Sequence, residues 1–283
     1  MKTLLLIDAD VLAYQSAFMA QANIQWKEDL WTTHVDLAIA KTWIVERIET
    51  FKNTLQGDEV ILAISDKNNF RRKLNPDYKA NRRSTFAPLG LDPIRDWLDE
   101  KYGTVKYPNL EADDVLAILA TERPNRLDRR IIVSIDKDFK GVPCEFYDFN
   151  RGELHNTSEE DAKKYHLMQT IAGDTVDGYK GVTGIGVVKA MRLLDNNGAN
   201  WDTVLKAYSD AGMTEEEALM NAWMAYLIRK DEYNHKHKQL KYLWMPDSFT
   251  PQQKRKYSQK IHEVTGELDE ELGRHQPFEP LGI

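Results

Sequence analysis

Three short apolar runs, each followed closely by an aspartate, constrain the fold of this chain more than any other feature. The runs and their aspartates are Leu4–Ile7 with Asp8, Val60–Ile64 with Asp66, and Arg130–Ile135 with Asp136. Runs of this length are typical of buried parallel strands, and amphipathic stretches lie between them at roughly 34–56, 91–101 and 112–121. We therefore expect an α/β fold with a mainly parallel central sheet flanked by helices. Because ligands sit beyond the carboxyl ends of such strands, the aspartates should converge.

Composition excludes several classes of protein. The chain has 283 residues, of which 42% are hydrophobic and 29% charged, as in ordinary globular proteins. Cys144 is the single cysteine, so an intrachain disulfide is excluded and a reducing compartment fits. No apolar run approaches the ~18 residues that a membrane span needs, and the N-terminal run is read as a strand.

The periodicity of the sequence changes near residue 157. Residues 1–157 are expected to form the α/β core and residues 158–245 a smaller helical region. Residues 246–283 are polar, and we expect them to form a C-terminal tail that crosses the surface or is partly mobile.

Ten carboxylates fall in five separated motifs along the chain. They are Asp8 and Asp10; Asp66; Glu111, Asp113 and Asp114; Asp136 and Asp138; and Asp174 and Asp177. Two carboxylates ~4 Å apart repel by ~4 kcal/mol at an effective dielectric constant of ~20, so such a cluster needs cations. Hard divalent ions prefer oxygen ligands, and no Cys/His set has zinc spacing, which favours Mg²⁺ or Mn²⁺. The alternative is that each aspartate caps a helix, as Asp10 in particular could.

A basic segment follows Asp66 directly. Its cations are Lys67, Arg71, Arg72, Lys73, Lys79, Arg82 and Arg83, with Phe70 and Tyr78 between them. Such a segment can contact phosphates and stack on unpaired bases, and Lys79 and Arg82 could face a scissile phosphate. The net charge of −7 does not exclude a nucleic-acid partner, because without the ten carboxylates the remainder is +3. A solvated basic helix is the alternative.

A glycine-rich turn, GVTGIG at 181–186, precedes an expected helix that begins near Val187. Glycines let a backbone approach a phosphate, and a helix N-terminus supplies N–H donors. Lys180 and Lys189 flank this turn and favour phosphate binding. A tight connection between two helices is the alternative.

Taken together and in this order, the motifs resemble those of the flap endonuclease-like 5′ nucleases, most nearly the bacteriophage 5′→3′ exonucleases. The segments that carry the resemblance are LLIDADVLAY, SDKNNFRRKLNPDYKANR, LEADDVLA, SIDKDF and AGDTVDGYKGVTGIGVVKA, and they cover roughly residues 3–245. The resemblance implies a helical arch near 67–90 in a metal-dependent nuclease core, and a helix–three-turn–helix element in a DNA-binding region at 158–245.

The resemblance also implies roles for individual residues. It places Asp8, Asp66, Glu111 and Asp113 around one metal ion, and Asp114, Asp136, Asp138, Asp174 and Asp177 around or between that site and a second. Lys79 and Arg82 match the YKxxR motif at the arch base. Arg71, Tyr78, Lys79, Arg82, Arg83, Lys180 and Lys189 are expected to contact DNA, together with Gly184, Ile185 and Gly186, whose loop can hold K⁺ in related enzymes. Asp10 and the short segment between Arg83 and Leu91 depart from the family pattern.

The hypothesis is a 5′→3′ exonuclease that uses two Mg²⁺ ions to hydrolyse DNA phosphodiesters, with Lys79, Arg82 and Asp136 essential to catalysis. Flaps and the RNA of RNA–DNA hybrids are further candidate substrates. We expect a monomer without membrane contacts, cytoplasmic in a bacterial host if it is phage-encoded. The alternatives are an Asp-nucleophile phosphatase that uses Asp8 and Asp10, a noncatalytic DNA-structure binder, and a single-strand ribonuclease of the related PIN type.

Overall fold

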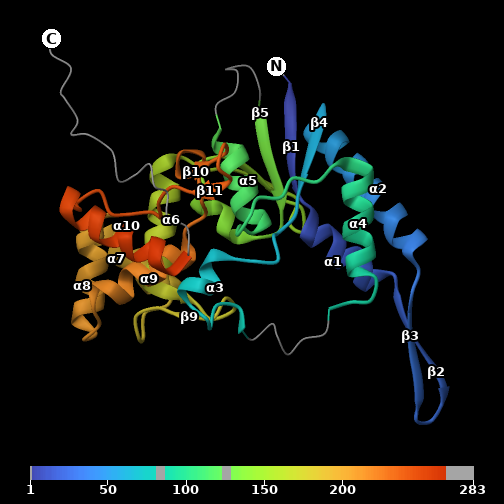
Figure 1. Cartoon of the computed structure of the whole chain (residues 1–283), viewed down its shortest axis with the longest axis horizontal. Helices are drawn as coiled ribbons and strands as arrows, with labels where there is room; N and C mark the ends of the chain where they lie inside the picture. The colour runs from blue at the N-terminus through green and yellow to red at the C-terminus, as the bar shows by residue number, and fades with distance from the viewer. Residues whose placement is uncertain (1, 81–86, 123–128, 266–283) are drawn as a thin grey trace.

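A five-stranded sheet forms the centre of the computed structural model, which describes residues 2–80, 87–122 and 129–265 (Figure 1). The strand order is β4-β1-β5-β6-β7. The strands are β1 (Thr3–Asp8), β4 (Glu59–Ala63), β5 (Arg129–Ser134), β6 (Glu145–Asp148) and β7 (Glu153–Asn156). Neighbours pair in parallel except β6 with β7. The carboxyl ends of β1, β4 and β5 therefore meet at one edge, as the sequence predicts.

Alternation along β1 separates the two faces of the sheet. Leu5 and Ile7 pack on one face against α1 (Ala9–Met19), α2 (Leu37–Leu55) and α4 (Leu91–Tyr102). Leu6, between them, points to the other face and packs against α5 (Ala112–Thr121) and α6 (Glu159–Ala172). All three side chains are fully buried. The mainly parallel sheet flanked by helices is thus confirmed.

The helical region packs against the Leu6 face of the sheet and shares its hydrophobic core. It contains α7 (Val187–Asn197), α8 (Trp201–Asp210), α9 (Glu215–Ala225) and α10 (Pro251–Thr265), with two short hairpins, β8 (Gly173–Asp174) with β9 (Tyr179–Lys180), and β10 (Tyr233–Asn234) with β11 (Gln239–Leu240). Leu167 and Trp223 of this region share one buried cluster with Leu6. The division into domains near residue 157 stays a prediction.

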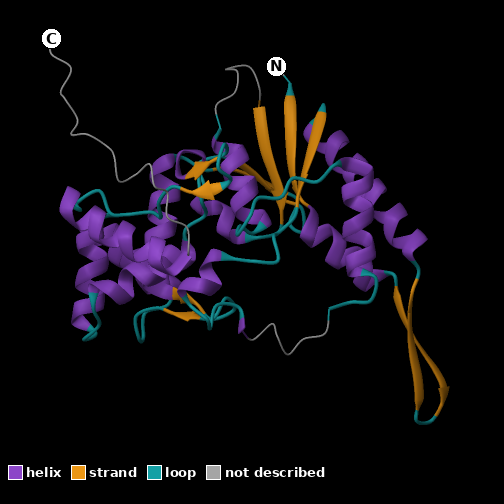
Figure 2. Ribbon diagram, viewed as in Figure 1, coloured by secondary structure: helices purple, strands orange, loops and turns teal. Residues whose placement is uncertain are grey.

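Two elements differ from the expectations. The amphipathic stretch expected at roughly 34–56 is the helix α2, which begins at Leu37 after Asp36 caps it. Before it, β2 (Gln21–Lys27) and β3 (Leu30–Val35) form a hairpin that projects from the body (Figure 2). The expected surface tail contains α10, whose Tyr257 is buried against Phe249 and Trp223.

Residues 81–86 lie outside the described residues, so the predicted arch is described only at its two ends. The basic end contains the short helix α3 (Phe70–Leu74). In the described part of the chain, no helix is long and apolar enough to cross a membrane.

Candidate active site

Asp8 and Asp136 lie at the carboxyl ends of the adjacent strands β1 and β5, and Ser134 joins them. The Ser134 hydroxyl donates to Asp8 Oδ2 over 2.9 Å, and the Asp136 N–H donates to Ser134 Oγ over 3.2 Å. Asp8 Oδ1 also accepts from the Val11 N–H at the start of α1. Asp8 is therefore a helix cap, as the alternative reading held, and still a member of a carboxylate group.

Helix α5 brings a third carboxylate, Asp113, to the two strand ends. Burial raises the pKa of Asp113 well above its ordinary value, and the charges of Asp136 and Asp8 raise it further. Burial, then Asp10 and Asp136, raise the pKa of Asp8 to about 7. Such mutual effects require the carboxylates to be near neighbours, so the predicted convergence of strand ends is observed for these residues.

Asp138, Asp174 and Asp177 form a second group that shares Asp136 with the first. Burial, then Asp136 and Asp177, raise the pKa of Asp138 to about 7. Lys137 Nζ lies 2.9 Å from Asp174 Oδ2 and, against the effect of burial, lowers the pKa of Asp174. These four acids line one hollow of about 650 Å³.

Lys79 places a positive charge beside both carboxylate groups. Its Nζ is 2.8 Å from Glu111 Oε1 and 3.8 Å from Asp177 Oδ2, and the side chain is nearly buried. Burial opposes the effect, but Lys79 and then Arg71 lower the pKa of Glu111 to about 2. Glu111 is therefore ionised at neutral pH, whereas Asp8 and Asp113 lie in a region of uncompensated negative charge.

Glycines let the 173–181 loop come close enough to deliver Asp174 and Asp177. A Cβ on Gly178, whose φ is +82°, would lie 2.5 Å from the Asp77 carbonyl oxygen. This close approach allows the Lys79 N–H to donate to the Asp177 carbonyl over 2.8 Å. The basic segment and the GDTVDG motif, which the sequence does not connect, are thus joined by a direct backbone contact.

Asp114, predicted to lie near the metal sites, is fully buried in another interaction. Arg71, predicted to contact DNA, binds it with both terminal nitrogens, over 2.7 and 2.8 Å. Arg71 is 1% exposed and also donates to the carbonyls of Met224 and Tyr226 at the end of α9. Asp114 further accepts from the Ile228 N–H. The structure corrects both predictions, because Arg71 offers almost no surface to DNA and donors already surround Asp114.

Asp66 is not brought together with the other carboxylates by any contact among the described residues. Its Oδ1 accepts from its neighbour Lys67 N–H over 2.8 Å, and its Oδ2 accepts from Asn109 N–H over 2.9 Å. Asp10, by contrast, reaches the end of β4, where it accepts from the Ser65 N–H and pairs with Arg95 over 2.7 Å. The Arg95 pair occupies Asp10, which disfavours the phosphatase alternative.

The aromatic side chains of the basic segment face inward. Phe70 is 1% exposed and Tyr78 is 2% exposed, so neither ring can stack on a base in this conformation. The Tyr78 hydroxyl instead donates to Glu111 Oε2 over 2.9 Å. Arg82 and Arg83 lie outside the described residues.

The glycine-rich turn is open, as a phosphate-binding loop needs to be. A Cβ on Gly184 or Gly186 would meet nothing within 4 Å, and α7 begins directly after Gly186. Lys180 is exposed, Ile185 is half-buried, and Lys189 donates to the Gly184 carbonyl over 3.3 Å. The DNA contacts predicted for these five residues stay predictions.

Sequence reasoning missed three polar residues of the site. Lys137 lies between two of the predicted acids in the chain, so its neutralising role could have been anticipated. Gln169, whose Nε2 donates to Asp138 Oδ1 over 2.6 Å, and Ser134 gave no signal in the sequence.

The carboxylates lie near one another, but their oxygens are not yet arranged to coordinate a metal ion. In the ranges that the structure describes, no three Asp, Glu, His or Cys side chains are already close enough to hold a metal ion. Like charges repel one another, and a divalent ion is what would draw their oxygens together.

Comparison with known proteins identifies the family. Residues 3–161, more than half of the chain, match the family model for the 5′-3′ exonuclease N-terminal resolvase-like domain. The chain belongs to the 5′–3′ exonuclease family. This match includes the first carboxylate group and Asp138.

Relatives of this family member extend the match beyond that domain. The exodeoxyribonuclease of Enterobacteria phage T3 is 32% identical over 286 aligned positions, which cover 87% of this chain and 94% of the relative. The exonuclease of Escherichia phage T7 is also 32% identical, with the same coverage. A flap endonuclease of Shewanella oneidensis is 31% identical over 58% of this chain and 64% of its own length.

Solved structures support the fold alone, because their sequences are distant. A bacteriophage T5 flap endonuclease, crystallised in a pseudo-enzyme–product complex with DNA and metal ions, has a TM-score of 0.63 at 15% identity. The alignment covers 94% of this chain and 100% of that one. The sheet and the helical region thus have the arrangement of a known nuclease fold.

Proposed function

We propose that this family member is a divalent-metal-dependent 5′→3′ exodeoxyribonuclease. The observation that carries the proposal is the gathering of Asp8, Asp113, Asp136, Asp138, Asp174 and Asp177, here called the carboxylate pool. Ser134 joins Asp8 to Asp136, Asp136 shares one hollow with the last three acids, and Lys79 lies beside the pool. The relatives matched over 94% of their length are named as exonucleases, which favours exonuclease over flap endonuclease activity.

The residues present fit two hard cations. Asp8, Glu111, Asp113 and Asp136 would hold one ion, and Asp138, Asp174 and Asp177 would hold a second, with Asp136 between them. Burial, and after it the charges of neighbouring acids, raise the pKa of Asp8, Asp113 and Asp138, so a cation beside them would favour their ionised forms. Oxygen ligands favour Mg²⁺, with Mn²⁺ as a substitute. When bound, these ions would stabilise the negative charge that develops on the attacking and leaving oxygens.

Lys79 would orient the scissile phosphate. Its ammonium group has three donors, of which one binds Glu111, so another can reach a phosphate oxygen. The backbone bond from Lys79 to Asp177 fixes its position relative to the second carboxylate group. The same cation therefore can hold the substrate against both metal-binding groups and offset charge in the transition state.

The glycine-rich turn at 181–186, called the glycine loop below, and the N-terminus of α7 would bind the phosphates of the duplex. Backbone N–H groups at a helix start favour negative charge, and Gly184 and Gly186 leave room for a close approach. A K⁺ ion that used the Gly184 carbonyl would have to replace the contact from Lys189.

The test is cleavage of DNA labelled separately at the 5′ and the 3′ end, as blunt duplex, flapped duplex and RNA–DNA hybrid, in Mg²⁺ or EDTA. We expect Mg²⁺-dependent release of small products from the 5′ end of duplex DNA and no product in EDTA. The Asp136→Asn variant should be inactive, while Asp247→Asn, an exposed aspartate paired with Lys163, should match the wild type. Cleavage from the 3′ end, or equal cleavage in EDTA, would refute the proposal.

A further inference from the structure

A second charged hollow lies outside the carboxylate pool. It has a volume of about 250 Å³ and two walls that are distant in sequence. Lys106 and Tyr107 form one wall. They directly follow Val105, whose backbone is hydrogen-bonded to the end of β4. His235 and Lys238, in the turn between β10 and β11, form the other.

The lysines of this hollow are exposed and unneutralised. Within the described ranges, Lys106 and Lys238 have no ion-pair partner, and neither have their exposed neighbours Lys67 and Lys236. Two acids lie beside the hollow: Asp66, both of whose oxygens accept backbone N–H groups, and Glu122, which pairs with Arg130 and lies beside His235. In a protein of net charge −7, four such lysines form a local cationic surface that suits an anion.

The walls of the hollow are fixed by aromatic packing. Tyr107 stacks on the buried Tyr233, with ring centroids 4.8 Å apart and planes 7° apart. His235 meets both rings edge-on, at 5.5 and 5.3 Å, and its imidazole also lies 3.2 Å from Glu122. A small, pre-formed hollow with lysines at its rim suits one unpaired nucleotide and its phosphates better than it suits a duplex.

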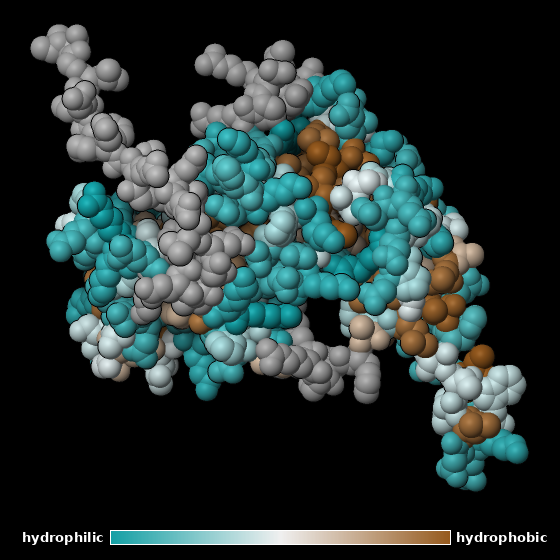
Figure 3. Space-filling view, viewed as in Figure 1, coloured by the Kyte–Doolittle hydropathy of each residue, from teal (hydrophilic) through white to brown (hydrophobic). Residues whose placement is uncertain are grey.

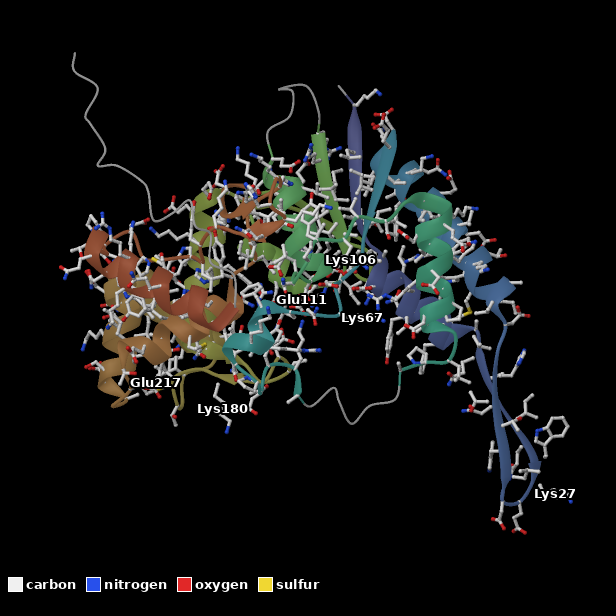
Figure 4. All side chains as sticks on the ribbon, in the orientation of Figure 1. Lys27, Lys67, Lys106, Glu111, Lys180 and Glu217 are labelled. Carbon is white, nitrogen blue, oxygen red and sulfur yellow. The ribbon has the colours of Figure 1, made fainter. Side chains whose placement is uncertain are left out.

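The position of the hollow relates it to the proposed substrate path. In the view of Figure 4, Glu111 lies between Lys106 and Lys180. Lys180 belongs to the glycine-loop side, where the duplex would be gripped. Lys106 is five residues before Glu111 in the chain, so their Cα atoms lie at most about 17 Å apart and a strand that passes the carboxylate pool can reach Lys106.

In Figure 3, brown patches lie on the β2–β3 hairpin, where Trp26 and Trp31 are more than half exposed. Nothing on that hairpin indicates which molecule would cover it, whereas the charge of the hollow does indicate an anion.

We propose that the hollow bounded by Lys106, Tyr107, His235 and Lys238 binds the phosphodiester backbone of an unpaired 5′ strand extension of the DNA substrate. This inference rests on the proposed function, because it takes the duplex to lie on the glycine-loop side. It adds a binding site on the 5′ side of the scissile phosphate, away from the carboxylates themselves.

The test is fluorescence anisotropy in EDTA, with a fluorescent blunt duplex and the same duplex carrying a short 5′ oligothymidine extension. The hollow variant is Lys106→Ala/Lys238→Ala. The matched control is Lys41→Ala/Lys101→Ala, which removes one lysine of α2 and one of α4, both of which lie over the Trp97 ring. We expect the extension to raise the affinity of the wild type and control about tenfold, and the hollow variant to lose most of this gain. Its salt dependence on the extended DNA should weaken by about 1.4 log units per log unit of salt, for two single-strand contacts.

Two results would overturn the inference. One is a hollow variant that keeps the full gain from the extension, and the other is an equal loss of affinity for both DNAs. Cleavage of the blunt duplex in Mg²⁺ separates this inference from the proposed function. If the wild type does not cut that duplex, the nuclease proposal fails. If the enzyme cuts the duplex but the 5′ extension does not raise its affinity, only the proposed role of the hollow is refuted.

Discussion

Removing one partner of the buried Arg71–Asp114 pair should be among the most destabilising single substitutions in this protein. Arg71 is 1% exposed and Asp114 is fully buried, and two bonds of 2.7 and 2.8 Å join them. Removing one partner of such a pair typically costs ~3–5 kcal/mol, because the other charge stays buried without compensation. Glu111, 3.3 Å from Arg71, retains part of the compensation, so we expect Asp114→Asn to lower the free energy of unfolding by about 3 kcal/mol.

Urea unfolding followed by circular dichroism would measure this change. The control is Asp210→Asn, which removes the exposed Lys206–Asp210 pair and should change the free energy of unfolding by less than about 0.5 kcal/mol. The double variant Arg71→Met/Asp114→Leu leaves no buried charge from this pair and should be more stable than Asp114→Asn. A loss below about 1 kcal/mol for Asp114→Asn, or a double variant less stable than the single one, would refute this reasoning.

Three further predictions follow from the site. Asp136→Ala should abolish cleavage of duplex DNA while binding in EDTA survives, because Asp136 lies between both carboxylate groups; turnover at the wild-type rate would contradict its role. Lys79→Met should lower single-turnover rates about 100-fold and affinity much less, whereas a role in docking alone predicts the reverse. In EDTA, stability should fall as the pH rises from about 4 through 7. The folded-state pKa of Asp8 and of Asp138 is about 7 against an ordinary 3.8, so between these values the folded protein holds protons that the unfolded chain releases. Asp138→Asn should show a shallower fall than the wild type in urea unfolding at pH 5.5 and 8.5, and an unchanged slope would count against the raised pKa.

The sequence predicted the central sheet well because its signal is local. Each apolar run is long enough for one buried strand, and the strands β1, β4 and β5 match the runs to within one residue at either end. The short strands β6 and β7 gave no such run, and the β2–β3 hairpin is mostly exposed, so hydrophobic patterning could not reveal it.

The site was predicted by residue type more accurately than by contact. Asp8 and Asp136 converge because the adjacent parallel strands β1 and β5 end at the same edge of the sheet, and helix α5 brings Asp113 to them. Arg71 was assigned to DNA binding because the sequence of a basic segment does not show which of its cations points inward. Its partner carbonyl at Met224 of α9 is more than 140 residues away in the chain. Asp66 follows β4 by three residues, which is enough for the loop to turn its carboxylate toward local N–H groups.

The central claim is that the carboxylate pool binds divalent cations, and titration calorimetry with Mn²⁺ near pH 7 tests it most directly. Because Asp8 and Asp138 are partly protonated at that pH, binding should release protons, and the heat should vary with the ionisation enthalpy of the buffer. We predict saturable binding in the wild type and in Asp247→Asn, weakened at least about tenfold in Asp113→Asn. A wild-type protein that binds no Mn²⁺, or an Asp113→Asn variant that binds it equally tightly, would contradict the account.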